Sequence, residues 1–593
     1  MKKQLRTCWR VSGNQTFFCF AAMALAVALG LGFSAQAFGQ VPEPPPPPAP
    51  GALNTVPVPM PADLGEYVSD MAAVRALGKA LFWDMQAGGD GRTACATCHF
   101  HAGTDARPQN TIGVRDATFR GANKTLTAAD FPIRTSEVVG GQGVIKRDFL
   151  GINMVKNSVN PVDKAKTVPD AVFNVGGVNT RQVTGRNTPT NFNAIFNDRQ
   201  FWDGRANHVF NGQNPLGDLA PGDGLWKYVG AQLTRVHVLT DNASLASQAV
   251  GPPNNNVEMS WNGRTFPELG KKMCALKPLA LQKVHANDSL LGPQANTKGK
   301  GLTAKNYAEL VRKAFRPEWW SSPGTVDGKF TQMEFNFSLF WGLSINLYEA
   351  LLVSDDSPFD RFARGNSGAL SAEQKTGMDI FMGKCAQCHS GPEFTSASVS
   401  NIGANRTELF PMAAGGQALV DTGFLNIGVR PTANDLGNGR GDLPGPISVA
   451  RRTHPGDLLA VDGAMKVPTV RNVELTGPYF HNGGRSTLTQ VVELYANGAD
   501  FANPELAAGI GIGKIRGKPD RIAAVVAFLK ALTDDRVRMQ KAPFDHPEII
   551  VPNGHSGFSK GVAVDNNVTI HAVGAGGGPA IHSFEEILNG ASL

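Results

Sequence analysis

The sequence has little surplus charge. Its 593 residues include 56 Lys and Arg against 50 Asp and Glu, for a net charge of +6. Four of the basic residues fall within the first 37 positions, where no acidic residue occurs, so the remainder is close to neutral. This balance gives no case for binding nucleic acid. The length exceeds what one hydrophobic core supports and predicts two or more domains.

The sequence also lacks a long apolar run of the kind that spans a membrane. Its most apolar stretch, FFCFAAMALAVALGLGF, lies near the N-terminus between basic residues and the small-x-small pattern SAQA. That order is typical of an export signal, here cleaved after about Ala37. We therefore expect a signal peptide over residues 1–37, a periplasmic location and no stable membrane span after cleavage. The alternative is an uncleaved membrane anchor.

Cysteine is scarce, and its placement is informative. The chain has seven cysteines, of which Cys8 and Cys19 would leave with the signal. The other five are two pairs and Cys274. An exported protein of this size could use disulfides, but if both pairs are occupied, Cys274 has no partner within the chain. We expect Cys274 to be a lone buried thiol.

Both pairs belong to the same pentapeptide, C-x-x-C-H. The two copies consist of Cys95, Cys98 and His99, and of Cys385, Cys388 and His389. On a helical turn this spacing places both thiols and the imidazole on one side. The thiols can then form thioether links to haem while the histidine coordinates the iron.

Zinc and redox thiols are the rival interpretations of these motifs. A zinc site gathers four ligands within a small module, whereas the two copies lie far apart and neither has a second Cys or His pair at finger spacing. A thioredoxin-like site needs a strand–turn–helix context, which neither copy shows. We therefore predict two covalently bound c-type haems, with His99 and His389 as proximal ligands. Two haems in one chain suggest electron transfer between them.

Proline, glycine and apolar spacing predict how the chain is divided. Residues 38–62 are a Pro-rich linker, expected to be an extended spacer. Helical apolar spacing occurs in YVSDMAAVRALGKALFWD, EFNFSLFWGLSINLYEALLV and KPDRIAAVVAFLKALTD. Ser371 and Gln374 predict a capping box at the start of the helix that leads to the second motif. We expect an N-terminal haem domain over 63–353, a C-terminal haem domain over 354–545 and a Gly-rich tail over 546–593 without helical pattern.

Five further stretches surround the two motifs: LGKALFWD, GRNTPTNFNAIFNDRQFWDGRA, QAVGPPNNNVEM, SPFDRFARG and KVPTVRNVELTGPYFHNGG. With them the chain resembles the bacterial di-haem cytochrome c peroxidase family, including its methylamine-utilisation branch, which matures a tryptophan-derived quinone. The resemblance implies a mainly α fold of two cytochrome c-like haem domains. Residues 100–185, which are loop-dominated, and residues 207–244 would be long insertions relative to that family.

The resemblance also assigns roles to residues around the first haem. It places Trp202, in the F-W-D-G-R motif, between the two haems. It places Gln248 and Glu258 on the distal side of the first haem, where a carboxylate can perform acid–base work on bound peroxide. Without the flanking motifs, Trp202 would be read as a core aromatic and Glu258 as a solvated surface charge.

A calcium ion between the haems is a further implication of the resemblance. The expected ligands are the side chain of Asn187 and the backbone carbonyls of Thr476 and Pro478. Oxygen ligands suit a hard cation. Taken alone, Asn187 would be read as a turn residue.

The sixth ligand of the second haem is where this sequence departs from the peroxidases of the family. They have a methionine in the slot that Tyr495 occupies within TLTQVVELY, and the quinone-maturing branch has tyrosine there. A phenolate favours ferric iron and lowers its potential; Met465, or no residue, is the alternative. Neither His101 nor His208 matches the distal histidine that blocks the first haem in many peroxidases. We therefore expect a first haem that is open to peroxide without prior reduction.

Together these features predict a periplasmic di-haem peroxidase. It would reduce hydrogen peroxide at the N-terminal haem with electrons relayed through the C-terminal haem from an external donor such as a small cytochrome or cupredoxin. The alternatives are an oxygenase or oxidative-maturation enzyme on the same scaffold, and a non-catalytic di-haem electron-transfer cytochrome.

Overall fold

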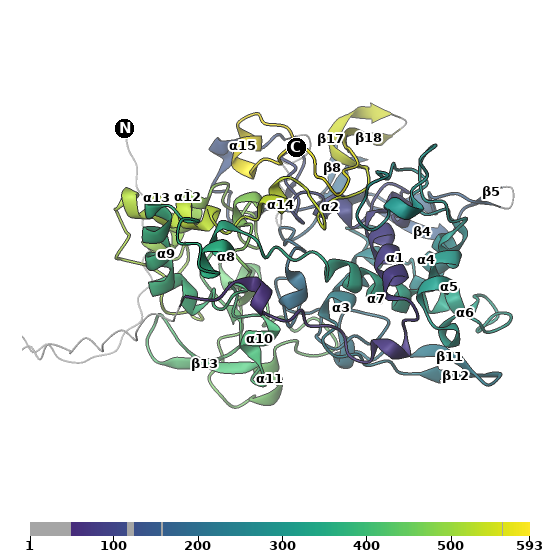
Figure 1. Ribbon diagram of the computed structural model, residues 1–593, viewed down its shortest axis with the longest axis horizontal. Coiled ribbons are helices and arrows are strands. Elements are labelled where there is room, and N and C mark those ends of the chain that lie inside the picture. Colours follow the sequence, from purple (N-terminus) through teal and green to yellow (C-terminus); the bar gives the residue numbers. More distant parts are fainter. Residues whose placement is uncertain (1–48, 115–123, 156–157, 560) are drawn as a thin grey trace, which may run out of the picture. The chain divides into compact units, whose positions relative to one another are not determined.

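The computed structural model describes residues 49–593 except 115–123, 156–157 and 560. The expected signal peptide and the first part of the Pro-rich linker lie outside the described residues. The described residues form one compact unit (Figure 1). In the part of the chain that is described, no helix combines the length and the apolar character needed to cross a membrane.

Two groups of helices build two separate apolar cores (Figure 1). The core of the first lobe draws on α1 (Met71–Trp83), α4 (Phe266–Ala275), α5 (Tyr307–Ala314) and α7 (Phe337–Glu349). The core of the second lobe draws on α8 (Pro358–Ala363), α9 (Ala372–Lys384), α12 (Leu488–Asn497) and α13 (Pro519–Lys530). The shorter helices are α2 (Ala96–His99), α3 (Ser244–Ala249), α6 (Gln332–Phe335), α10 (Val399–Ile402), α11 (Val449–Thr453), α14 (Asp535–Arg538) and α15 (Phe584–Leu588).

The helices expected from apolar spacing form where the sequence predicts them. The Asp70 side chain caps α1 by accepting from the backbone N–H groups of Ala72 and Ala73. Ser371 and Gln374 form the predicted capping box at the start of α9. In α13 the apolar stripe faces the core, with Val525 only 2% exposed. Local capping and amphipathic spacing are sufficient to specify these helices.

Each lobe contains one very close helix crossing. A Cβ atom added to Gly78 of α1 would lie 1.9 Å from the carbonyl oxygen of Ser344 in α7. A Cβ atom added to Gly377 of α9 would lie 1.8 Å from the carbonyl oxygen of Ala524 in α13. Only glycine permits these backbones to approach so closely, so each crossing fixes the helix that leads towards one C-x-x-C-H motif.

The mainly α expectation is not confirmed, because the described residues also contain nine two-stranded antiparallel sheets. Five lie in the insertion at 100–185, which was expected to be loop-dominated. Their strands have two to five residues, too few to show an alternating pattern in the sequence. The five pairs are β1 (Ile112–Val114) with β2 (Glu137–Val139), β3 (Gln142–Ile145) with β10 (Arg181–Val183), β4 (Arg147–Gly151) with β7 (Lys164–Thr167), β5 (Met154–Val155) with β6 (Ser158–Val159), and β8 (Asn174–Val175) with β9 (Val178–Asn179).

The other four sheets are distributed over the rest of the chain. The insertion at 207–244 contains one hairpin, and the last is formed by the C-terminal segment. The four pairs are β11 (Leu225–Val229) with β12 (Gln232–Val236), β13 (Thr407–Pro411) with β14 (Gln417–Asp421), β15 (Phe424–Leu425) with β16 (Met465–Lys466), and β17 (Ile549–Ser559) with β18 (Val562–Ile570).

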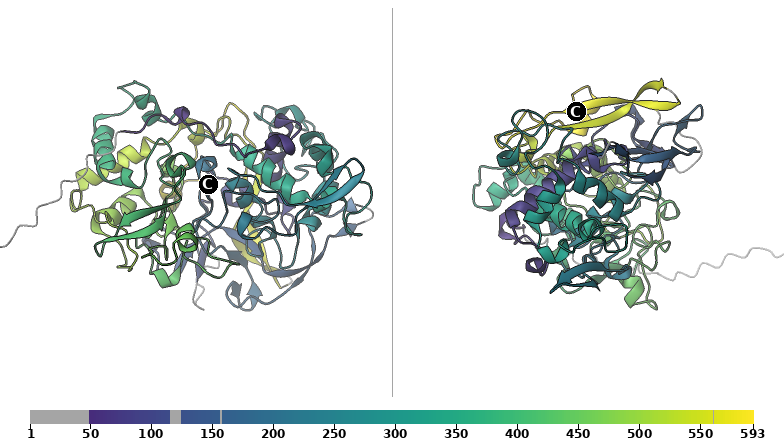
Figure 2. Two further views of the ribbon diagram at one scale, coloured as in Figure 1. Left: turned by 90° about the horizontal axis from the view of Figure 1, so that it is seen from below. Right: turned by 90° about the vertical axis from the view of Figure 1, so that its right-hand side faces the viewer.

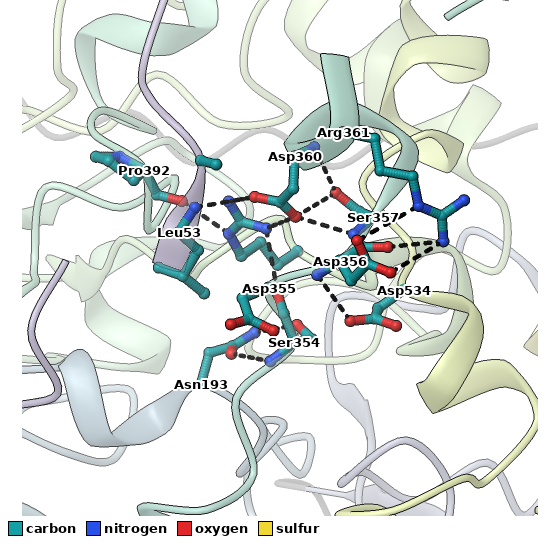
Figure 3. A network of polar contacts seen from close by, with 12 residues as sticks. Leu53, Asn193, Ser354, Asp355, Asp356, Ser357, Asp360, Arg361, Pro392 and Asp534 are labelled. Carbon is teal, nitrogen blue, oxygen red and sulfur yellow. Dashed lines mark hydrogen bonds and ion pairs between the residues drawn. The ribbon is translucent and has the colours of Figure 1, made fainter. Parts of the chain in front are cut away.

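The described part of the Pro-rich linker is packed between the lobes and is not a free spacer. Leu53 is 1% exposed, and its backbone N–H donates to Asp360 at 2.9 Å (Figure 3). Arg471 donates to the same carboxylate at 2.8 and 2.9 Å. The expectation was wrong for this part because Val56, Val58 and Met60 pack with Leu53 against an apolar cluster, and burial of this surface favours docking over a free extended chain.

The C-terminal segment is an ordered part of the first lobe, contrary to the expected Gly-rich tail (Figures 1 and 2). β17 and β18 form a long hairpin, and Ile549 and Val551 belong to the first apolar core. Asp545 forms a buried ion pair with Lys79 of α1 at 3.4 Å. Helical spacing does not reveal this segment because its partners lie far earlier in the chain, such as Gln282, 266 positions before Glu548, and Arg107, 445 positions before Pro552.

Candidate functional site

The first C-x-x-C-H motif forms the one-turn helix α2. The backbone N–H of Cys98 donates to the carbonyl of Cys95 at 3.1 Å, which closes the turn. His99 Nδ1 lies 2.7 Å from the carbonyl oxygen of Gly103. Because a carbonyl can only accept, Nδ1 carries the proton, and Nε2 keeps the lone pair that an iron ligand needs. Burial lowers the pKa of His99, which also favours the neutral imidazole.

The second motif repeats this arrangement at the end of α9. Cys385 caps the helix, and the backbone N–H of His389 donates to the Cys385 carbonyl at 2.9 Å. His389 Nδ1 lies 3.0 Å from the carbonyl oxygen of Pro468. Burial lowers the pKa of His389. Both histidines are therefore neutral and have Nε2 free for a metal.

Each motif lines its own cavity. The cavity at the first motif has a volume of about 780 Å³ and that at the second about 210 Å³. Gln248 and Glu258 line the first cavity together with the first motif. The second cavity is lined, together with the second motif, by Asn187, Thr476, Pro478 and Tyr495.

The two cavities share one wall. It is formed by Trp202 and residues 187–190, which line both cavities.

The loop that carries Glu258 is held by the insertion at 100–185. The Asn255 side chain accepts from the backbone N–H groups of Val257 and Glu258 at 2.8 and 3.2 Å. Val144 of β3 donates to the Val257 carbonyl at 2.9 Å, and Gln182 of β10 donates to the Asn256 carbonyl at 2.8 Å. The insertion therefore buttresses the distal side of the first cavity.

Glu258 and Gln248 face the same space from different elements. Gln248 lies in the last turn of α3, and Glu258 lies ten positions later in the buttressed loop. Burial raises the pKa of Glu258, and the positive charge of Arg205 opposes this shift. The carboxyl group therefore holds its proton to a higher pH than a solvated glutamate does, which suits an acid–base group.

Trp202 is fixed in the shared wall by hydrogen bonds at both ends. Its indole Nε1 donates to the carbonyl of Asn187 at 2.8 Å, and its own carbonyl accepts from the backbone N–H of Lys466 at 2.7 Å. Its ring lies edge-on to that of His481, with centroids 6.3 Å apart. The half-buried side chain is thus in contact with both cavities.

The residues expected at a calcium site partly converge. The Asn187 side-chain amide is in close contact with the Pro478 carbonyl and donates to the Phe480 carbonyl at 3.4 Å. Thr476 lines the same cavity. In the described part of the chain, no group of three or more His, Cys, Asp and Glu side chains is arranged to hold a metal ion. Any cation here would rely on amide and carbonyl oxygens.

Tyr495 and Met465 both line the second cavity. Tyr495 lies on α12, with its ring centroid 6.3 Å from that of Phe480. Burial raises the pKa of its phenol, and the nearby thiols of Cys388 and Cys385 add to the effect. Tyr495 thus keeps its proton in this cavity unless a cation such as ferric iron displaces it.

The two histidines considered as distal ligands lie elsewhere. His101 Nε2 lies 2.7 Å from the carbonyl of His582 in the C-terminal segment, and His208 pairs with Asp241 at 2.7 Å. Among the described residues that line the first cavity, His99 is the sole histidine. Cys274 is buried and unpaired, as expected.

Two charged residues at the cavities have no motif and were missed in the sequence. Glu349 of α7 is 1% exposed in the wall of the first cavity, where burial raises its pKa to about 8. Its Oε1 accepts from Asn191 at 2.9 Å. Lys466 of β16 is 6% exposed in the wall of the second cavity, and burial lowers its pKa to about 8. In the sequence, each of these two residues appears only as a single charged side chain within an apolar stretch.

The donor sets and cavities fit haem better than zinc or redox thiols. Burial raises the pKa of Cys98 to about 12, the opposite of what a reactive redox thiol requires. Each cavity offers two thiols and a neutral imidazole on one wall. Lys466 has no carboxylate within ion-pair distance among the described residues, so the second cavity suits a group that is largely apolar and carries a carboxylate.

Comparison with known proteins gives a consistent picture. A family model described as "Di-haem cytochrome c peroxidase" matches residues 72–145 and 161–368. Cytochrome c551 peroxidase of Pseudomonas aeruginosa is 27% identical over 356 residues, 60% of this chain and 66% of that protein. Cytochrome c peroxidase Ccp of Escherichia coli is 28% identical over 331 residues, 54% of this chain and 46% of that protein.

A third relative belongs to the methylamine-utilisation proteins. The methylamine utilization protein MauG of Methylorubrum extorquens is 31% identical over 155 residues, 26% of this chain and 33% of that protein. The matched regions therefore span less than two thirds of each of these three relatives.

Proposed function

A model of the di-haem cytochrome c peroxidase family matches residues 72–145 and 161–368, and we propose that the chain is a periplasmic member of this family that reduces hydrogen peroxide in its first cavity. The observation that carries this proposal is the grouping of Gln248 and Glu258 in the cavity of the first C-x-x-C-H motif. The large volume of that cavity supports access by a small substrate.

Covalently attached haem would be held by Cys95, Cys98 and His99 in the first cavity and by the matching residues in the second. When bound, haem supplies the redox equivalents. The protein positions and protonates the substrate. Glu258 would take a proton from one peroxide oxygen and return it to the other, which is released as water. The Gln248 amide orients the peroxide by hydrogen bonding.

Electrons would reach the first cavity from the second through the shared wall. Trp202 is the aromatic side chain that lines both cavities, and its two hydrogen bonds hold it in place. An external donor such as a small cytochrome or cupredoxin would deliver electrons to the second cavity.

Tyr495, in preference to Met465, would supply the side-chain oxygen that helps to hold haem iron in the second cavity. A phenolate is a hard anionic donor that favours ferric iron. This choice also supports the second candidate function, an oxidative-maturation enzyme on the same scaffold, for which a low-potential second site would be suitable. Asn187, Thr476 and Pro478 are proposed to hold a calcium ion when it is present, with the Asn187 amide turned to present its oxygen.

The test uses holoprotein from cells that assemble c-type cytochromes. The mature chain should carry the mass of two haem groups and should consume peroxide stoichiometrically with a reduced donor. Turnover with dioxygen and no peroxide would instead favour the oxygenase alternative. Two fully ligated haems with negligible peroxide turnover would mean that the chain is an electron-transfer cytochrome.

A further inference from the structure

The proximal side of the first motif contains a second, much smaller cavity. It has a volume of about 20 Å³ and lies against His99 on the side of α1 and α7. Trp83, the last residue of α1, and Tyr348 of α7 line it together with His99. His546, from the C-terminal segment, completes this wall. Two readily oxidised side chains therefore lie beside the histidine that is proposed to bind iron.

The indole and the phenol form a pair. Trp83 Nε1 donates a hydrogen bond to the Tyr348 hydroxyl at 3.0 Å. The Phe82 ring connects this pair to the motif, with its centroid 6.1 Å from His99, 6.1 Å from Trp83 and 5.6 Å from Tyr348. Trp83 is 5% exposed and Tyr348 3% exposed, so the route is shielded from water.

The surroundings of Trp83 favour a positive charge on its ring. His546 stacks on the indole, with centroids 4.7 Å apart and planes 7° from parallel. Burial lowers the pKa of His546 to about 4, so its imidazole is neutral and does not repel a cation. Nearby, Lys79 is paired with Asp288 at 2.8 Å and with Asp545 at 3.4 Å, which leaves one more carboxyl than ammonium group in this buried cluster.

We propose that Trp83, hydrogen-bonded to Tyr348, is a redox-active residue that supplies one electron to the first haem site during peroxide reduction. This inference rests on the proposed peroxidase function. The reduction of one H₂O₂ to two H₂O takes up two electrons and two protons. One electron leaves the Trp83 indole, which becomes a cation radical and keeps both its N–H proton and the hydrogen bond that this group donates to the Tyr348 oxygen. The other comes through Trp202, and the external donor later restores the indole.

Tyr348 is the less suitable site for the electron hole. Oxidation of a phenol expels its proton, and burial, together with the charges of Asp288, Asp545 and Glu349, raises the pKa of Tyr348. The Tyr348 oxygen instead accepts the Trp83 hydrogen bond, which stabilises the oxidised indole. Trp83 and Tyr348 also line the same small cavity as His99, the proposed iron ligand. An ordinary contact in the apolar core would not have this position.

Trp341 provides a matched comparison. It lies on α7, is fully buried and donates from Nε1 to the Ala249 carbonyl at 2.9 Å. It does not line the small cavity at His99. If burial in the first lobe were sufficient for oxidation, Trp341 would behave like Trp83.

The experiment is rapid-freeze electron paramagnetic resonance of the two-haem protein after one equivalent of peroxide, with the haem absorption spectrum recorded on the same mixture. We expect a tryptophan radical in the wild type, identified by line narrowing when the protein contains ring-deuterated tryptophan. The Trp83→Phe variant should lose the signal, Trp341→Phe should keep it, and Tyr348→Phe should shift its spectrum by removing the hydrogen bond. The labelled wild type tests the proposal without any substitution.

The outcomes separate this inference from the proposed function. A radical that survives Trp83→Phe, or that disappears only in Trp202→Phe, overturns the role of Trp83. A haem spectrum that responds to peroxide without any tryptophan radical also overturns it and leaves the peroxidase function standing. A haem spectrum that does not respond to peroxide would contradict both the redox role of Trp83 and the proposed peroxidase function.

Discussion

The two cavities share the same C-x-x-C-H motif and one wall but differ in the other residues that line them. The first, at about 780 Å³, has the carboxyl groups of Glu258 and Glu349 and the amide of Gln248 in its wall. The second, at about 210 Å³, has Tyr495, Met465 and the ammonium group of Lys466. Identical motifs can thus be set in different surroundings, because the other residues that line each cavity come from other parts of the chain.

The strongest test of this difference removes the acid–base group of the first cavity. Glu258→Gln should lower kcat/KM for peroxide by about 10²–10⁴-fold, the usual contribution of a general acid–base residue. Stopped-flow kinetics with a reduced donor measure the effect. Glu373→Gln, at an exposed position on α9, is the control. An unchanged kcat/KM in Glu258→Gln would mean that Glu258 does not act as an acid–base group in the first cavity.

The second test makes the second cavity resemble that of a methionine-ligated site. Tyr495→Met should raise the midpoint potential of the second haem on the order of 0.1 V, because a thioether stabilises ferrous iron more than a phenolate does. A spectroscopic redox titration measures both haems. If Met465 is the ligand, Tyr495→Met leaves the potential in place and Met465→Leu shifts it.

The third test uses the buried carboxyl group of Glu349, which lines the first cavity and not the second. Its folded pKa of about 8 lies above the ordinary value of 4.5. Between these values the unfolded chain releases the proton and the folded chain retains it, so wild-type stability falls as pH rises through this window. Glu349→Gln should escape this loss and gain about 1 kcal/mol per pH unit relative to wild type.

Thermal melts of the wild type and Glu349→Gln from pH 5 to pH 8 measure this difference. The gap between the two melting temperatures should widen as pH rises and level off above about pH 8. Glu493→Gln, at an exposed position on α12, should show no such trend. A gap that does not depend on pH would indicate that Glu349 is already ionised in the folded protein.

The smallest expected effect concerns the isolated ammonium group of the second cavity. Lys466→Gln removes a buried positive charge and should lower the midpoint potential of the second haem on the order of tens of millivolts. The first haem should change less, because Lys466 lines only the second cavity. Lys530→Gln, exposed on α13, is the control. Equal shifts at both haems would contradict a local role for Lys466.

Much of the helical framework could be predicted from the sequence. α1, α7, α9 and α13 lie where apolar spacing or a capping box predicts them, because these signals act within one or two helical turns. The short hairpins of the insertion at 100–185 could not be predicted, since two-residue strands carry no periodic signal. The packing of Leu53 and the C-terminal hairpin was missed because both depend on partners hundreds of residues away.

The candidate site divides in the same way. The C-x-x-C-H motifs could be recognised from sequence because their members are close along the chain, whereas Gln248 and Glu258 were assigned through the resemblance to a family. Glu349 and Lys466 could not, since each is a single charge whose meaning depends on the cavity it faces.

The sequence alone determined where the two C-x-x-C-H motifs stand, because a thiol–thiol–imidazole turn is complete within five residues. Only the tertiary structure decided what those motifs face. The strands of an insertion hold Glu258, two helices bring Trp83 to Tyr348, and a C-terminal segment stacks His546 on the indole. Contacts between such distant segments arise from the packing of whole elements, which no local pattern encodes.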